Sequence, residues 1–171
     1  MRIAQVRAFM VVGVLLIIAV TTCWYAIAND SQTSAGRKNC KTGDVPVNIE
    51  LPQNKDVNVK VLNATDSQGL ATSAADSLKE YGFHVVDTGT SKRHDVKNVE
   101  LRYGPKMVAG GHLLRAFFVA ADYTFQLDND ADYVEITLGQ AFQQVNTESD
   151  ARNSLSVLGR PKAPEGTCPI T

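Results

Sequence analysis

The sequence predicts an α+β fold: a split β-α-β sandwich with the order β-α-β-β-α-β, in which two helices cover one face of a four-stranded sheet. Four short segments alternate apolar and polar residues, as strands with one buried face do, and two longer segments repeat apolar residues with a helical period. Because the strands alternate and are not apolar on both faces, we expect an antiparallel sheet. An N-terminal transmembrane helix and a short C-terminal helix complete the prediction.

The composition limits the size of the protein and its classes of partner. The chain has 171 residues, of which 44% are hydrophobic, and its formal net charge is -1. This length leaves room for one modest domain, and there is no excess of basic residues to attract nucleic acid. We therefore expect no nucleic-acid partner.

Residues 8–28 carry no charge, and such a helix reaches about 30 Å, the thickness of a bilayer core. We predict a single-pass anchor in the cell membrane. Arg2 and Arg7 precede it, so residues 1–7 should be a cytoplasmic N-terminus and the remainder should be extracytoplasmic. Cleavage as a signal peptide is the alternative, because residues 26–28 fit a small-x-small pattern.

The residues after the anchor predict a tether and a covalent staple. Residues 29–56 are rich in Ser, Thr, Asn, Gly and Pro and lack sustained periodicity, so we assign them to an extracytoplasmic tether. Outside the cytosol, Cys40 and Cys168 favour a disulfide over a metal pair or a nucleophile with its base. Neither cysteine lies in a CxxC motif or beside a histidine, which supports the structural role.

The domain itself is predicted over residues 57–142. Its first strand is 57–61, where valines alternate with polar residues. Thr65 or Asp66 is the expected N-cap of the helix that follows, and Gly82 is its C-terminal stop. Residues 83–86 form the second strand.

The second half of the domain repeats this pattern of elements. Residues 99–103 form the third strand, and Gly104 with Pro105 begins a helix whose apolar face extends to Ala121. Residues 133–139 form the fourth strand. In the C-terminal part, 143–171, we expect a capped helix over 147–158 and a Pro-rich tail that bears Cys168.

One face of the predicted sheet has no helix to cover it. The polar positions of the strands should meet on that face: Lys60, Glu100, Arg102, Glu135 and Thr137. We take the first four of these as candidate partner-binding residues. The second predicted helix is the alternative surface: its Gly110 and Gly111 indicate either close packing on the sheet or a place where a partner approaches.

No catalytic, cofactor or metal site is predicted. The turn before the first helix contains only Gly69 and neither GxGxxG nor GxxxxGK[ST], and Asp66 would repel a phosphate at the helix start. The three histidines have no ligand spacing, and residues 128–132 lack the Gly and Glu that an EF-hand requires. There is also no GxSxG motif.

Three segments resemble successive blocks of the LytR C-terminal domain family: "VKVLNATDSQGLATSAADSLKEYGFHVV", "VELRYGP" and "VEITLGQAF". The resemblance covers about residues 57–142, with one departure, Ala64, where the family commonly has Gly. Such modules are often found behind LytR-CpsA-Psr phosphotransferase domains. The segment before residue 57 is too short to hold such an enzyme, so its activity is not implied.

The complete arrangement of anchor, tether with Cys, domain and terminal Cys is similar to that of envelope-integrity proteins of mycobacteria and their corynebacterial relatives. The resemblance implies a non-catalytic membrane-anchored protein that supports cell-wall and envelope integrity. Its expected partners are the cytoplasmic membrane, bound through the N-terminal helix, and a cell-wall polymer, an envelope lipid or an envelope protein. An accessory or regulatory subunit of a wall-polymer phosphotransferase is the alternative function.

Overall fold

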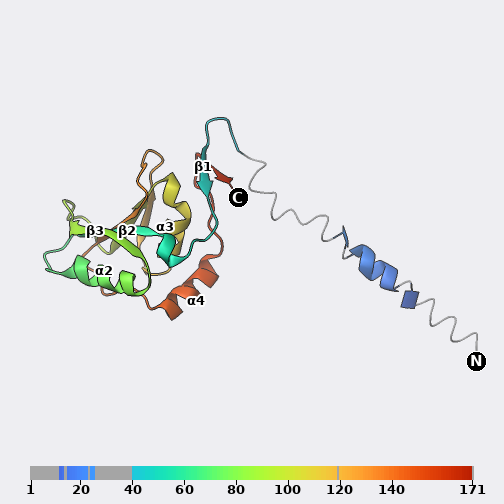
Figure 1. The fold of residues 1–171 in the computed structure, drawn as a ribbon, viewed down its shortest axis with the longest axis horizontal. Helices are drawn as coiled ribbons and strands as arrows, with labels where there is room; N and C mark the ends of the chain where they lie inside the picture. The colour runs from blue at the N-terminus through green and yellow to red at the C-terminus, as the bar shows by residue number, and fades with distance from the viewer. Residues whose placement is uncertain (1–11, 14, 23, 26–39, 119, 171) are drawn as a thin grey trace, which may run out of the picture. The chain divides into compact units, whose positions relative to one another are not determined.

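The structure is a computed structural model that describes residues 12–13, 15–22, 24–25, 40–118 and 120–170 (Figure 1). The chain divides into two units, Met1–Lys38 and Asn39–Thr171. The described residues of the first unit are helical. Within the described residues, no helix has both the length and the apolar content needed to cross a bilayer. Residues 8–11, 14, 23 and 26–28 of the predicted anchor, and residues 29–39 of the predicted tether, lie outside these residues.

A five-stranded mixed sheet forms the centre of the second unit. The strands lie in the order β3 (His84–Thr90), β2 (Asn58–Asn63), β6 (Val134–Leu138), β4 (Val99–Tyr103) and β5 (Asp122–Phe125). Strand β2 is parallel to both of its neighbours, and β4 is antiparallel to β6 and parallel to β5. The α+β class is confirmed, but the expected antiparallel, split arrangement is wrong. The β2–α2–β3 crossover places its two strands side by side.

Strand β5 is the strand of this sheet that the sequence analysis did not predict. The second helix was expected to continue to Ala121, but it consists of a 3-10 turn, η2 (Pro105–Met107), followed by α3 (Val108–Leu114). Beyond α3 the chain turns, with Ala120 at a φ of 54°, and β5 begins two residues later. The apolar residues beyond Leu114 are therefore buried in a turn and do not continue the helix.

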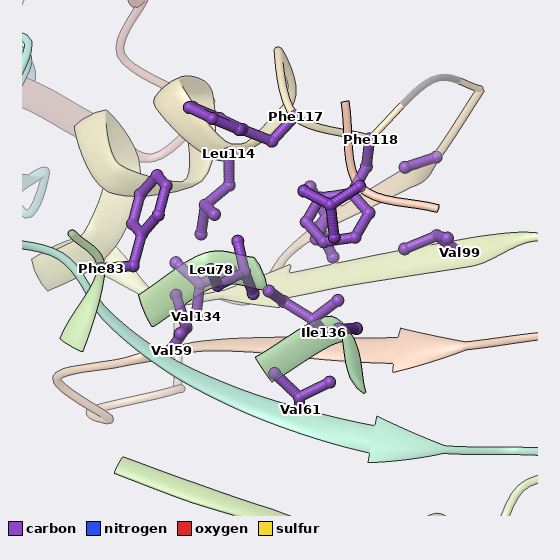
Figure 2. Close-up of a cluster of buried hydrophobic side chains, with 14 of the residues drawn as sticks. Val59, Val61, Leu78, Phe83, Val99, Leu114, Phe117, Phe118, Val134 and Ile136 are labelled. Carbon is purple, nitrogen blue, oxygen red and sulfur yellow. The ribbon is translucent and has the colours of Figure 1, made fainter. Parts of the chain in front are cut away.

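The helices α2 (Leu70–Glu80) and α3 bury their apolar side chains in one core with the sheet. Figure 2 shows Leu78 and Leu114 gathered with strand residues such as Ile136. All three of these side chains are fully buried. Burying one such side chain stabilises the fold by about 1.5–3 kcal/mol, so this core is what holds the helices on the sheet.

The turn that precedes α2 is organised by one asparagine. Asn63 Oδ1 accepts hydrogen bonds from the Thr65 backbone N–H (2.9 Å) and hydroxyl (2.8 Å), and its Nδ2 donates to the Ser67 carbonyl (2.7 Å). The N-cap position is occupied by Gly69, at a φ of 79°, and no side chain caps the helix. The expected N-caps Thr65 and Asp66 are therefore wrong, because the turn closes on Asn63 before the helix begins.

The folded unit extends upstream of the predicted domain start. Strand β1 (Val45–Asn48) pairs in parallel with β7 (Thr167–Ile170), and η1 (Asn54–Asp56) leads into β2. These upstream elements fall inside the range that we assigned to the tether. The pattern VPVN is too short to show its period, and its pairing partner lies at the other end of the chain.

A disulfide joins Cys40 to Cys168 across this ribbon, with a Cα–Cα distance of 5.3 Å. The predicted pairing is confirmed. Helix α4 (Glu148–Leu158) is also confirmed, and the Thr147 hydroxyl accepts a hydrogen bond from the Asp150 N–H at its start. Both termini of the folded unit are thus tied to each other.

Candidate functional site

The uncovered face of the sheet carries a row of polar side chains that crosses all five strands. In register, from β3 to β5, the row is Asp87, Lys60, Glu135, Arg102 and Thr124. We call these five residues the charged row. Their strand neighbours, such as Val61 and Ile136, point into the core on the opposite face and are fully buried. The strands therefore fix the spacing of the row.

At one end of the row, Lys60 and Asp87 form an ion pair of 3.2 Å. The hydrogen bond from the Lys60 ammonium to Asp87 raises the pKa of Lys60 above its ordinary value. The same ammonium lies 6.0 Å from the centre of the Tyr133 ring. Both side chains of the pair are partly open to solvent, so the pair contributes little to the stability of the fold. Its main effect is to orient the Lys60 side chain.

Toward the other end of the row, the Glu100 carboxylate gathers three donors. It accepts a hydrogen bond from the Thr124 hydroxyl (3.2 Å), lies 3.6 Å from Arg102 Nε, and pairs with Arg93. Arg93 comes from the loop between β3 and β4 and also pairs with Asp95 at 3.1 Å, which lowers the pKa of Asp95. The Glu100 side chain is only 13% exposed and is therefore neutralised within its own chain.

Arg102 and Glu135 form no ion pair with each other or with another member of the charged row. They are opposite each other in the β4–β6 register. Arg102 Nε is buried and donates no hydrogen bond. Among the described residues, no ion pair involves Glu135. The partly exposed Arg102 guanidinium and the Glu135 carboxylate are therefore the charges of this face that an incoming molecule can pair with.

The structure brings together the four predicted partner-binding residues on the neighbouring strands β2, β6 and β4: Lys60, Glu100, Arg102 and Glu135. Thr137 is on the same face but is 2% exposed, so its predicted exposure is wrong. It lies in the adjoining row, flanked by Leu62 and Glu100, on the central strand. Neighbours on both sides close over such a short side chain.

Sequence reasoning missed Asp87, Arg93 and Thr124. Asp87 joins the row because the β2–β3 register shifts between Val59 and Lys60. Such a bulge is set by tertiary pairing and leaves no periodic signal. Thr124 belongs to the missed strand β5, and Arg93 belongs to a loop without a regular pattern.

The metal-ligating side chains do not assemble a centre in the described part of the chain, where no three such groups come together. His84 Nδ1 lies 2.8 Å from Asn58 Oδ1 on the sheet, and His112 Nε2 lies 2.9 Å from the Gly159 carbonyl oxygen. Each of these two histidines thus already has a protein partner. The site is a polar surface rather than a cleft.

The fold is shared with a protein of known structure. The soluble domain of a conserved hypothetical secreted protein from Mycobacterium marinum is similar, with 22% identity and a TM-score of 0.56, over 67% of this chain and 82% of that one. This likeness shows a shared fold. A comparison with curated proteins finds no match. The sequence model of a family described as LytR cell envelope-related transcriptional attenuator matches residues 56–142, just over half of the chain. The chain therefore belongs to this LytR-related family.

Proposed function

We propose that the chain is a non-catalytic, membrane-anchored protein that supports cell-wall and envelope integrity by binding or scaffolding another envelope component. The main observation is the helix-free sheet face with its charged row, where Arg102 and Glu135 lie opposite each other and form no ion pair within the row. Membership of an envelope-related family supports the setting. The apolar segment within residues 8–28 supports the anchor.

The construction of this face suits recognition rather than chemistry. Its side chains stand on adjacent strands of a sheet, so their positions are rigid before a partner arrives. Basic and acidic groups alternate along the row, which gives a partner a defined register instead of a uniform field. Alternation therefore favours a partner with a fixed pattern of polar groups.

The position of the disulfide fits an anchored module. Cys40 is the first described residue of the folded unit, and the bridge joins it to Cys168 near the other end. An anchor upstream of Cys40 would therefore attach at the staple itself. Tension from the membrane would reach a covalent bond before it reached the four-residue strand β1.

The double variant Arg102→Gln/Glu135→Gln tests the proposal. It removes one positive and one negative charge, so the net charge is unchanged. Glu135 forms no ion pair among the described residues, and Arg93 still neutralises Glu100 when Arg102, 3.6 Å from that carboxylate, is replaced, so we expect the free energy of unfolding to change by less than about 1 kcal/mol. In cells that lack the native protein, the variant should fail to restore the permeability barrier of the envelope. The permeability of these cells should remain near that of the deletion strain.

The matched control makes the same two substitutions on α4: Glu148→Gln/Arg152→Gln. These residues form an exposed pair at 3.5 Å, away from the sheet. We expect this control to restore permeability as the native chain does. Full restoration by Arg102→Gln/Glu135→Gln, at equal protein abundance, would refute a role for the sheet face.

A further inference from the structure

The order of charges along the charged row is complementary to its own reverse. From β3 to β4 its charges run negative, positive, negative, positive. A two-fold axis parallel to the strands reverses the strand order of a facing copy. Lys60 then lies opposite Glu135 of the second copy, and Asp87 lies opposite Arg102 of the second copy. Each of the four contacts joins opposite charges, as an isologous interface requires.

We propose that the open sheet face is a homodimer interface, in which two copies stack their sheets face to face through the charged row. The inference rests on the proposed function, because it names a second copy as the envelope partner of that same face. Facing sheets lie about 10 Å apart, a gap that long Lys, Arg and Glu side chains from both sides fill. The Arg102 guanidinium, on a side chain that is 30% exposed, gains Asp87 of the second copy as an ion-pair partner.

The adjoining row is compatible with this arrangement. From β3 to β4 it contains Gly89, Leu62, Thr137 and Glu100. Under the same axis Leu62 lies opposite Thr137 of the second copy, and Gly89 lies opposite Glu100 of the second copy. The Glu100 carboxylate is already neutralised by Arg93 and Arg102 in its own chain. No pair of like charges is brought together in either row.

The charge pattern also distinguishes a second copy from the other envelope partners. The four charges of the row sum to zero, so a polyanionic wall polymer or an anionic headgroup gains no net attraction. A row of alternating charges instead attracts a partner whose charges have the complementary order. A reversed copy of this chain has that order.

Two single variants test the interface in the full-length chain in detergent micelles. Lys60→Glu places two carboxylates opposite each other at the two-fold contact, and Glu135→Lys places two ammonium groups opposite each other. Each variant alone should self-associate at least tenfold more weakly than the native chain, measured by sedimentation equilibrium. Added salt should weaken the native dimer, because its contacts are charged.

Mixing the two variants separates a lost contact from a damaged fold. In a mixed pair, the new carboxylate at position 60 lies opposite the new ammonium at position 135, and the remaining contacts also join opposite charges. With one variant fluorescently labelled, the mixture should bind within about threefold of native affinity. A monomeric native chain, undiminished self-association of either variant, or a mixture that stays monomeric would each overturn the proposal.

These outcomes are distinct from failure of the proposed function. If Arg102→Gln/Glu135→Gln abolishes complementation while the native chain is monomeric, the face binds a different partner and only the homodimer is wrong. If the native chain dimerises through this face and that variant still complements fully, the proposed function of the face is wrong.

Discussion

Replacement of both Cys40 and Cys168 by alanine should lower the free energy of unfolding by about 4–5 kcal/mol. The bridged residues are 128 positions apart, so the bridge removes much of the conformational freedom of the unfolded chain. It also holds β1 and β7, which pair only with each other and span four residues each. Urea denaturation of the oxidised variant and native chains measures the difference through the midpoint.

Reduction provides the control for this prediction. Dithiothreitol should lower the midpoint of the native chain toward that of the double variant and should leave the variant unchanged. Equal midpoints for the oxidised native and variant chains would show that the bridge contributes nothing to stability. The expected loss would leave a domain of this size near its folding threshold.

Gly104→Ala should lower the free energy of unfolding by about 3 kcal/mol. A Cβ at this position would lie 1.7 Å from the carbonyl oxygen of Asn129 and 2.8 Å from its carbon. Both atoms belong to the backbone of a turn that two hydrogen bonds hold in place. The Asn129 N–H donates to the Gln126 carbonyl oxygen, and the Ala131 N–H donates to Asn129 Oδ1. The φ of Gly104 is -104°, so the cost is steric rather than conformational. Thermal denaturation measures it.

Gly89→Ala is the matched control. Its Cβ would meet Leu62 Cδ2 at 3.5 Å, an ordinary contact, and the residue lies in strand β3. We expect a change in unfolding free energy of less than about 0.5 kcal/mol. If Gly104→Ala melts at the same temperature as Gly89→Ala, the close approach of the two backbones is not as tight as the structure shows.

Local patterns predicted the parts of the fold that one segment determines alone. Alternation located the buried side of β4 through Val99 and Leu101, and the same rule placed Lys60 and Arg102 on the open face. Helix α4 followed from its capping residue Thr147. In each case, the information lies within a few neighbouring residues.

Features that depend on distant pairing were not predictable in the same way. Alternation reports that one face of a strand is buried, but it does not report the direction of the neighbouring strand. The sequence therefore did not predict that both neighbours of β2 run parallel to it. Strand β1 gains its definition from β7, and β5 gains its definition from β4. None of these pairings leaves a periodic signal in either strand alone.

The same division applies to the candidate site. The four predicted partner-binding residues occupy the open face because each belongs to a strand whose period was visible. Asp87 required the register shift in the β2–β3 pair, and Arg93 required the path of a loop. The alternation of charge across the row is thus a property of the assembled sheet and of no single segment.

Photocrosslinking in intact cells tests most directly whether the open sheet face contacts another molecule. A photoactivatable amino acid replaces Leu62, an uncharged neighbour of the row, and, as a control, Thr72 on the exposed side of α2. We expect a crosslinked product from position 62 and none from position 72, and a product of twice the chain's mass would identify a second copy. The absence of product at position 62, or equal products from both positions, would contradict the claim that this face is the binding surface.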